Sequence, residues 1–300
     1  MPKSKSVLVL AAGSLGDSLL TLPALRFLSS QSDVTLAGTA PYGALGAELL
    51  GVGRVMPLDP LLQTLYTPET GPSQGDFWRS FGKILLFFKE PDETILEKIS
   101  ALSRAQVCFP SKPFGDFLKE GRWAAEYWLE TASQEPVPYD SPHRQAKLCL
   151  SGKVRERGRS LLSDLGLSAP LVIHPGSGSP NKNAPLDFFR TAAERSVKES
   201  HREVLVIWGE AEERNLEDLK KTFEGMEGVR LLPGALPLDG LAALLSQCSA
   251  YLGNDSGVTH LAAACGLRTF AIFQTTDARI WGPQEAVIWA ALQSLNSAGE

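Results

Sequence analysis

The chain has 300 residues, enough for two domains of ordinary size. Hydrophobic residues make up 43% and charged residues 21% of it, a globular composition that argues against a disordered or fibrous protein. The net charge of −5 provides no basic field, so nucleic acid is not an expected partner. No apolar run approaches the roughly 20 residues of a membrane-spanning helix.

Cysteine usage and the N-terminal segment indicate where the chain works. The cysteines form no CxxC pair and have no histidine at zinc-site spacing, which favours a reduced, cytosolic compartment; they are Cys108, Cys149, Cys248 and Cys265. Lys3 and Lys5 precede the apolar run 7–12, which resembles the core of a signal peptide. The run stops at Gly13, so a strand followed by a glycine loop explains it better, and we expect a cytoplasmic protein.

The N-terminal half predicts a series of strands and helices. Short apolar runs predict strands buried on both faces of a parallel sheet, at 7–10, 34–36, 84–88 and 106–109. Leucines at helical spacing predict one helix over 17–28, with Pro23 in its first turns. The Pro-, Gly- and Thr-rich stretch 59–80 is expected to be a mobile loop. Residues 131–146 are polar and hold three prolines, which is typical of a linker.

A second series of elements follows this linker. Strands are predicted at 171–173, 204–208, 229–232, 250–252 and 269–273, the last of which closes the series. Helices are predicted from about 186, at 241–245 and at 258–265. Strands that alternate with helices indicate parallel sheets with helices on both faces. We therefore predict an α/β fold with two Rossmann-like domains, 1–140 and 147–300, facing a central cleft that would hold the ligand.

A polar glycine turn at residues 253–257 separates a predicted strand from a helix of small residues. The free backbone N–H groups at the start of that helix, together with the helix dipole, form an anion site that suits a pyrophosphate. Ser256 and Thr259 can add hydroxyl donors. Alternatively, Asp255 or Ser256 merely caps the helix.

A second glycine-rich loop, residues 174–185, follows the predicted strand 171–173. Its glycines allow close backbone approach to a ligand, and Lys182 adds one positive charge. The loop lacks the Gly-Lys-Ser/Thr arrangement of a Walker motif. With Ser177, Ser179 and Lys182 it suits a diphosphate; the alternative is an ordinary connection with a solvated lysine.

The third motif, residues 13–17, follows the first predicted strand. Its glycine spacing does not match the GxGxxG fingerprint of a dinucleotide site. Asp17 stands at the junction of loop and helix, where a carboxylate facing a cleft could act as a general base. It could equally be the N-cap of the helix.

Together these motifs resemble the ADP-heptose:lipopolysaccharide heptosyltransferases, glycosyltransferase family 9. That family has a Gly-Asp loop, a Thr-x-Pro-Ala-Leu helix, a His-Pro-Gly loop with a downstream lysine, a Gly-Asn-Asp-Ser-Gly turn, and later Thr-Asp and Trp-Gly-Pro pairs. In this chain they stand in family order at Gly16-Asp17, 21–25, 174–176 with Lys182, 253–263, 276–277 and 281–283. Residues 40–130 match nothing that can be aligned.

The resemblance implies a GT-B fold and an inverting, metal-independent transfer of a heptose from an ADP-sugar to a lipopolysaccharide-core-type acceptor, without a cofactor. Backbone N–H groups and Lys182 would stabilise the departing diphosphate, and no Asp-x-Asp metal motif is present. Asp255 would bind sugar hydroxyls, and Asp17 would deprotonate the acceptor after domain closure. The expected donor-binding residues are Ser177, Gly178, Ser179, Lys182, Glu210, Glu213, Leu236, Asp255, Ser256, Gly257, Thr259 and His260.

Two of these assignments keep alternatives, and a third includes a second residue. The ribose hydroxyls would be bound by Glu210, Glu212 or Glu213. Leu236 would line the base site together with Leu238. His260 is either a donor ligand or a buried structural histidine.

The acceptor, a lipid-linked saccharide, is expected on the N-terminal domain, at Ser14, Leu15, Gly16, Arg79 and Lys83. The lysines and arginines nearby could instead be solvated surface, as could those at Lys112, Lys119 and Arg122. Three tryptophans could stack on sugar or belong to the core; they are Trp78, Trp123 and Trp128. Residues 114–129 could form an amphipathic helix on a membrane surface, giving peripheral contact with the inner membrane.

Three other functions remain compatible with the sequence. The first is a transferase of the same fold that uses another nucleotide-sugar or acceptor, which base preference would reveal. The second is a dinucleotide oxidoreductase, against which the missing GxGxxG counts. The third is a non-catalytic nucleotide-binding relative; retention of Asp17, Lys182 and Asp255 counts against it.

Overall fold

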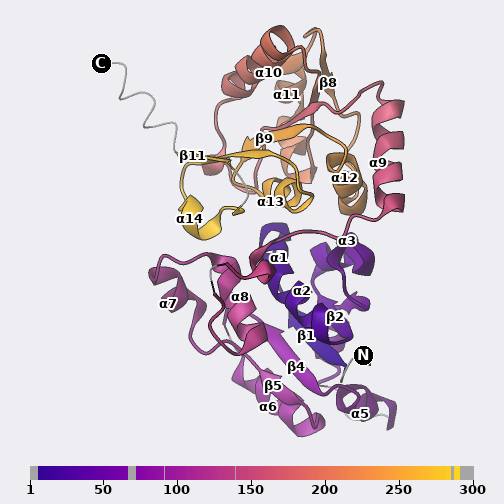
Figure 1. Cartoon of the computed structure of the whole chain (residues 1–300), viewed down its shortest axis with the longest axis vertical. Coiled ribbons are helices and arrows are strands. Elements are labelled where there is room, and N and C mark those ends of the chain that lie inside the picture. The colour runs from indigo at the N-terminus through magenta and orange to yellow at the C-terminus, as the bar shows by residue number, and fades with distance from the viewer. Residues whose placement is uncertain (1–5, 67–71, 91, 139, 285–286, 291–300) are drawn as a thin grey trace. The chain divides into compact units, whose positions relative to one another are not determined.

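The structure is a computed structural model that describes residues 6–66, 72–90, 92–138, 140–284 and 287–290. The chain divides into two compact units, Met1–Cys149 and Leu150–Glu300, called here the N-terminal and C-terminal units. Each unit is a parallel β-sheet with helices on both faces (Figure 1), as the alternation of strands and helices predicts.

The N-terminal unit has a five-stranded sheet in the order β3-β2-β1-β4-β5. Its strands are β1 (Val7–Ala11), β2 (Val34–Gly38), β3 (Arg54–Pro57), β4 (Lys83–Phe87) and β5 (Gln106–Cys108). All pairs are parallel, and Val7 is in register with Val34 on one side and Lys83 on the other. β1 is buried along its whole length, which explains its continuous apolar sequence.

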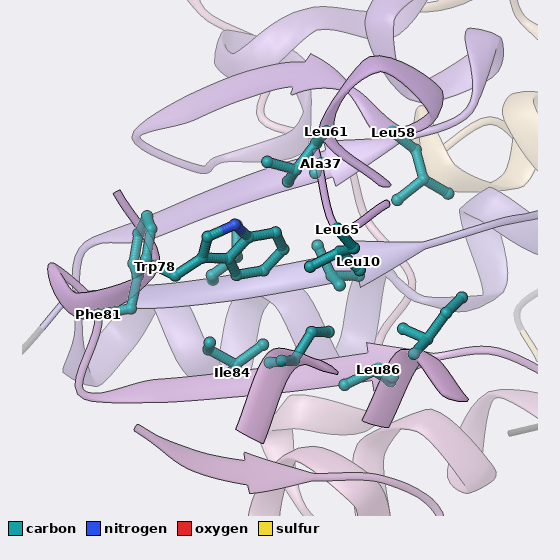
Figure 2. Close-up of a cluster of buried hydrophobic side chains, with 12 residues drawn as sticks. Leu10, Ala37, Leu58, Leu61, Leu65, Trp78, Phe81, Ile84 and Leu86 are labelled. Atoms are coloured by element: carbon teal, nitrogen blue, oxygen red, sulfur yellow. The ribbon is translucent and has the colours of Figure 1, made fainter. Parts of the chain in front are cut away.

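Helices cover both faces of this sheet. Side chains on one face form a hydrophobic core with α4 (Leu58–Gln63), α5 (Pro72–Arg79) and α6 (Glu93–Leu102). Figure 2 shows this core, in which the fully buried Trp78 ring lies beside Leu10 and Ile84 of the sheet. The remaining helices are α1 (Leu15–Leu20), α2 (Leu22–Gln31), α3 (Ala40–Leu50), α7 (Phe114–Lys119) and α8 (Ala124–Ser133).

Two predictions about the N-terminal unit are wrong. The single helix predicted over 17–28 is two helices, α1 and α2, with Thr21 between them. Pro23 explains the break, because proline has no N–H for an intrahelical bond and is favoured in the first turn of a new helix. The stretch 59–80, expected to be a mobile loop, carries most of α4 and all of α5; residues 67–71 lie outside the described ranges.

The prediction of a membrane-surface helix over 114–129 is also wrong. This stretch contains α7 and the start of α8, separated by a turn. Trp123 and Trp128 are both 3% exposed, and Trp128 contacts the Phe87 ring of β4 at a centroid distance of 5.4 Å. Both rings, like that of Trp78, therefore belong to the core rather than to a sugar- or membrane-binding surface.

The segment 131–146, expected as a linker, packs on the N-terminal unit instead. Its first residues complete α8, and Pro142–Arg144 form a short 3₁₀ helix, η1. Arg144 is 7% exposed and pairs with Glu126 of α8, which Arg122 also binds. A buried guanidinium paired with a buried carboxylate holds this proline-rich stretch against the helix.

The C-terminal unit has a six-stranded parallel sheet in the order β11-β10-β9-β6-β7-β8. Its strands are β6 (Leu171–His174), β7 (Val204–Val206), β8 (Val229–Leu231), β9 (Ala250–Asn254), β10 (Thr269–Phe273) and β11 (Val287–Ala290). The edge strand β11 pairs with β10 and was not predicted. It follows α14 (Ala278–Trp281), which is one turn long, so the usual signal of a long crossover helix is missing.

Helices also cover both faces of the second sheet. On one face, α10 (Leu186–Ser200) and α11 (Leu216–Phe223) pack on the strands through Phe189 and Phe223. The others are α9 (Gly152–Asp164), α12 (Leu238–Leu245) and α13 (Gly257–Ala264). Gly158 lets α9 approach α12 closely, because a Cβ there would collide with the Ala243 carbonyl. Among the described residues, no helix is long and apolar enough to span a membrane.

Candidate functional site

Each sheet has one point where the strand order reverses. In the N-terminal unit the chain starts at β1, adds β2 and β3 on one side, and then adds β4 and β5 on the other. In the C-terminal unit the same reversal falls between β6 and β9. Loops at the carboxyl ends of such strands diverge and leave a crevice, which is where open α/β sheets bind ligands.

In the C-terminal unit, a buried asparagine fastens the two predicted loops together at this switch point. Asn254, the last residue of β9, is fully buried. Its Nδ2 donates to the Pro175 carbonyl at 2.6 Å, and its Oδ1 accepts from the Ala184 N–H at 2.9 Å. Ser177 Oγ lies 2.7 Å from Asn183 Oδ1, within the same loop. The lysine-bearing loop 175–184 is therefore fixed to the end of β9.

Lys182 and Asp255, both predicted donor-site residues, form an ion pair there. The Lys182 ammonium lies 2.7 Å from Asp255 Oδ2, and Thr276 Oγ donates to the same oxygen at 2.6 Å. The Asp255 side chain is 8% exposed, whereas that of Lys182 is 31% exposed. Asp255 Oδ1 has no hydrogen-bond partner among the described residues. The pair thus offers a partly exposed cation and one open carboxylate oxygen.

The N-terminus of α13 stands beside this pair. Ser256 is its N-cap and accepts from the Thr259 N–H, so the capping alternative is correct for this serine. The Thr259 hydroxyl binds the Asn254 carbonyl and lies 3.1 Å from the Tyr251 hydroxyl, so it supports the turn rather than facing a ligand. The N–H groups of Gly257 and Val258 precede the first intrahelical bonds and remain as anion donors.

A third group comes from the carboxyl end of β7. Glu212, in the 3₁₀ helix η3 (Glu210–Asn215), accepts from the Gly209 N–H at 2.8 Å and lies 3.4 Å from His174 Nε2. Its side chain fills the space where a Cβ of Gly176 would lie. Burial raises the pKa of this carboxyl, but His174 and the Gly209 N–H outweigh it and hold the pKa below its ordinary value. Glu212 therefore carries its charge beside the glycine-rich loop.

The remaining predicted donor residues lie in different surroundings. Glu213 is exposed, the Glu210 side chain lies outside the described residues, and Glu212 lies against the loop at Gly176. His260 is buried, with 7% of its surface exposed. Gly178, Ser179 and Leu236 lie in loops at the carboxyl ends of β6 and β8, on the same edge of the sheet.

The N-terminal unit places Asp17 at its own switch point, just after β1. Ser14 is the N-cap of α1, and Asp17 is the third helical residue, so Asp17 is not itself the N-cap. Asp17 Oδ2 accepts from the backbone N–H of Ser14 at 3.2 Å and from its hydroxyl at 3.0 Å. Gly13 lies against the helix so closely that a Cβ there would be 2.5 Å from Asp17 Cβ. Leu15 and Gly16 form the first turn that carries this carboxylate.

Lys89 completes the group and was missed by the sequence analysis. Its ammonium lies 2.8 Å from Asp17 Oδ1 and 5.5 Å from the centre of the Phe114 ring. Burial raises the pKa of Asp17, but Lys89 and the two Ser14 donors outweigh it and lower the pKa below its ordinary value. A signal existed, since Lys89 follows the strand 84–88 as Asp17 follows the first strand.

Arg79 and Lys83 do not belong to this group. Lys83 is the first residue of β4 and donates to the Ala132 carbonyl at 3.2 Å. Arg79 ends α5, just before that strand, and pairs with Asp76 at the surface. Both stand at the amino edge of the sheet, whereas Ser14 to Asp17 follow the carboxyl end of β1. The prediction that these five residues form one acceptor site is therefore wrong for Arg79 and Lys83.

The remaining predicted basic patch is engaged in ion pairs on the surface of the N-terminal unit. Lys112 pairs with Glu120, Lys119 pairs with Asp116, and Arg122 binds carboxylates of α8. Within the described ranges, no three His, Cys, Asp or Glu side chains gather in a way that could hold a metal ion.

Two Rossmann-like parallel-sheet units, each with polar side chains gathered at its switch point, are the architecture of a GT-B protein. The family model described as glycosyltransferase family 9 (heptosyltransferase) matches residues 119–298. The chain belongs to this family.

Individual relatives support the same placement. Lipopolysaccharide heptosyltransferase 1 of Pseudomonas aeruginosa is 34% identical over 120 residues, which are 40% of this chain and 33% of that protein. The chain thus matches about a third of the length of this curated relative.

Solved structures show the same fold. A glycosyltransferase family 9 protein from Veillonella parvula has a TM-score of 0.78 at 17% identity, covering 99% of this chain and 88% of that one. The Escherichia coli heptosyltransferase WaaC, solved with ADP, has a TM-score of 0.69 at 16% identity, covering 98% of both chains.

Proposed function

We propose that the protein is a metal-independent, inverting glycosyltransferase that moves a heptose from an ADP-sugar to a lipopolysaccharide-core-type acceptor, and that it works in the cytoplasm. Family membership supports the reaction class, and the ADP bound by WaaC supports the nucleotide. The observation that carries the proposal is the Lys182–Asp255 pair beside the N-terminus of α13. A cation and free N–H groups at one switch point suit a diphosphate.

The donor would bind across the carboxyl edge of the C-terminal sheet. The diphosphate would accept from the N–H groups of Gly257 and Val258 and from the Lys182 ammonium, which are positioned before the reaction. The open Oδ1 of Asp255 would accept from a sugar hydroxyl. The charged Glu212 would accept from ribose hydroxyls, and Leu236 would contact the base. Because Lys182 already has Asp255 as a partner, the diphosphate must share or replace that pairing.

Asp17 would act as the general base. Its carboxylate takes the proton of the acceptor hydroxyl, whose oxygen then forms a bond to the anomeric carbon of the donor sugar. The bond from that carbon to the diphosphate oxygen breaks, and its electron pair leaves with the ADP. The attacking and leaving oxygens occupy opposite faces of the carbon, so the configuration inverts.

Calorimetric titration with ADP, UDP, GDP and NAD, without and then with Mg²⁺, tests this assignment. We expect selective ADP binding that needs no metal and that weakens in Lys182→Ala. Preference for UDP or GDP would replace the donor assignment while keeping the reaction class. Preference for NAD, or no nucleotide binding, would contradict a transferase and favour an oxidoreductase or a non-catalytic relative.

A transfer assay tests the acceptor separately. A lipid-linked core saccharide should gain one heptose from ADP-heptose, and sedimentation with anionic vesicles would show any peripheral contact with the inner membrane. ADP binding without transfer to this acceptor would contradict the acceptor assignment alone.

A further inference from the structure

The Asp17 carboxylate is held from two sides by groups of different chain segments. Ser14, three residues earlier, provides two donors to Oδ2. Lys89, 72 residues later, provides one donor to Oδ1. The rigid attachment of these segments to neighbouring strands β1 and β4, which are in register from Val7 with Lys83 to Ala11 with Phe87, keeps the three donors in place.

The hydrogen bonds to the two Asp17 carboxylate oxygens determine which oxygen can accept a proton. Each carboxylate oxygen has two lone pairs that can accept hydrogen bonds. Both sites on Oδ2 are used by Ser14, whereas Lys89 uses one of the two on Oδ1. Among the described residues, one acceptor position of Oδ1 therefore stays open, and its direction depends on where Lys89 holds that oxygen.

We propose that Lys89 is the positioning residue of the Asp17 base, fixing Oδ1 so that its open lone pair takes the proton of the acceptor hydroxyl. This inference rests on the proposed transferase function. Lys89 does not itself take or give a proton in the reaction. Its ammonium keeps the carboxylate charged and fixes its orientation, and the ammonium also lies over the Phe114 ring, 5.5 Å from the ring centre.

The other titratable groups on the helices around Asp17 are neutral, paired elsewhere or exposed. On α3, the buried Tyr42 hydroxyl faces α1, and burial raises its pKa to about 12, so it stays neutral. On α8, Glu126 and Glu130 are both paired with Arg122. On α2, the single charged side chain, Arg26, is exposed. Lys89 is thus the charged group that acts on the Asp17 carboxylate in this part of the structure.

The experiment compares wild type with Lys89→Met, Lys89→Arg and a matched control, Lys98→Met. Lys98 is also half-buried in the N-terminal unit and lies over an aromatic ring, that of Tyr66, but it donates to the Leu65 carbonyl instead of a carboxylate. Two properties are measured: the pKa of Asp17 from the ¹³C shift of its labelled carboxyl, assigned with Asp17→Asn, and the release of ADP from ADP-heptose with water as the acceptor.

In Lys89→Met we expect the pKa of Asp17 to rise, because burial is no longer opposed by the ammonium. The acid limb of the kcat profile should move to higher pH with it. At a pH above the acid limbs of both wild type and variant, kcat of the variant should still be roughly 10- to 100-fold lower, because Oδ1 of Asp17 is no longer fixed. KM for ADP-heptose should be unchanged. Lys89→Arg should restore most of kcat, and Lys98→Met should behave as wild type.

The two readouts separate this proposal from the proposed function. A pKa of Asp17 that does not respond to Lys89→Met, or a kcat that falls equally in Lys98→Met, would overturn the role of Lys89. Failure of the wild type both to bind ADP and to release ADP from ADP-heptose, with or without the core saccharide, would overturn the transferase reaction instead, even if the Asp17 pKa depends on Lys89.

Discussion

The two switch points each hold a lysine–aspartate ion pair, but in opposite order along the chain. In the N-terminal unit the aspartate, Asp17, follows the first strand, and Lys89 follows β4. In the C-terminal unit the lysine, Lys182, follows the first strand, and Asp255 follows β9. The Asp255 side chain is 8% exposed, compared with 21% for Asp17.

This difference in burial indicates different chemistry at equivalent places. Lys182 and Thr276 both bind one oxygen of Asp255, and the Lys182 side chain is 31% exposed beside it, which suits an anionic ligand. Asp17 is the more accessible of the two carboxylates, although Lys89 is itself 42% exposed, and its open lone pair suits a hydroxyl group. The same pair of residue types can therefore serve binding in one unit and proton transfer in the other.

The largest expected effect comes from Asp17→Asn, which keeps the shape of the side chain but removes its basicity. Transfer should slow by about 10²- to 10⁴-fold, the usual contribution of a general base. ADP affinity should not change, because the proposed donor residues belong to the C-terminal unit. Asp59→Asn, an exposed aspartate of α4, is the control. Equal activity of the two variants would remove Asp17 from the mechanism.

The second effect concerns the loop that carries Lys182. Asn254→Ala leaves the Pro175 carbonyl and the Ala184 N–H without their buried partner, which should lower the free energy of unfolding by about 2–4 kcal/mol. ADP affinity should fall as well, since the loop loses its attachment. Asn181→Ala, an exposed asparagine of the same loop, should change neither property. Thermal unfolding and calorimetry measure both; matching results for the two variants would show that Asn254 does not hold the loop.

Lys182→Met should reduce ADP affinity by about 10- to 100-fold, because a charge-assisted hydrogen bond contributes roughly 1.5–3 kcal/mol. The pKa of Asp17 should be unchanged in this variant. Lys221→Met, at an exposed lysine of α11, is the matched control. If Lys221→Met weakened ADP binding as much, the effect would be one of net charge rather than of the site.

Gly13→Ala tests the close packing under Asp17. The new methyl group would lie 2.5 Å from Asp17 Cβ, so the helix start must shift, at a cost of about 1–2 kcal/mol of stability. Activity should fall while ADP affinity stays constant. Gly43→Ala, in α3 where a Cβ meets nothing within 4 Å, should be neutral or slightly stabilising. An active Gly13→Ala variant would show that the position of Asp17 tolerates this shift.

The smallest effect is the pH dependence of stability. The pKa of Asp17 is lower in the folded protein than in the unfolded chain. The ionised carboxylate therefore adds to the free energy of unfolding at pH values above its pKa in the unfolded chain, and this contribution is lost as the pH falls through its pKa in the folded protein. Wild type should therefore lose more stability than Asp17→Asn as the solution is acidified across that range. Denaturant unfolding at a series of pH values measures this. Parallel curves for the two proteins would mean that the ion pair contributes no net stability.

The sequence predicts those features that depend on local pattern. Short apolar runs identify the inner strands, and the polar loops after them identify the carboxyl edge at Lys182, Asp255 and Asp17. The edge strand β11 could not be predicted, because its one-turn connection lacks the helical pattern of the other crossovers. The choice of Glu212 among three neighbouring glutamates also needs the conformation of η3, which places its carboxylate at Gly176.

Other features can be predicted from the sequence only once the order of the strands in the sheet is known. Residues before a strand and residues after it stand at opposite edges of a parallel sheet, which separates Lys83 from Asp17. The pairing of Asp17 with Lys89 depends on β1 and β4 being neighbours, although β2 and β3 come between them in the chain. The position of Asn254 in its motif gives no sign that it fastens a loop 70 to 79 residues earlier, because that contact arises from the adjacency of β6 and β9.

The division of labour between the two ion pairs is tested most directly by titrating ADP into Asp17→Asn and Lys182→Met and measuring ADP release from ADP-heptose by both. We expect Asp17→Asn to bind ADP as wild type does while its turnover is lost, and Lys182→Met to bind ADP at least tenfold more weakly. Weakened ADP binding in Asp17→Asn, or unchanged binding in Lys182→Met, would contradict the assignment of donor binding to one switch point and proton transfer to the other.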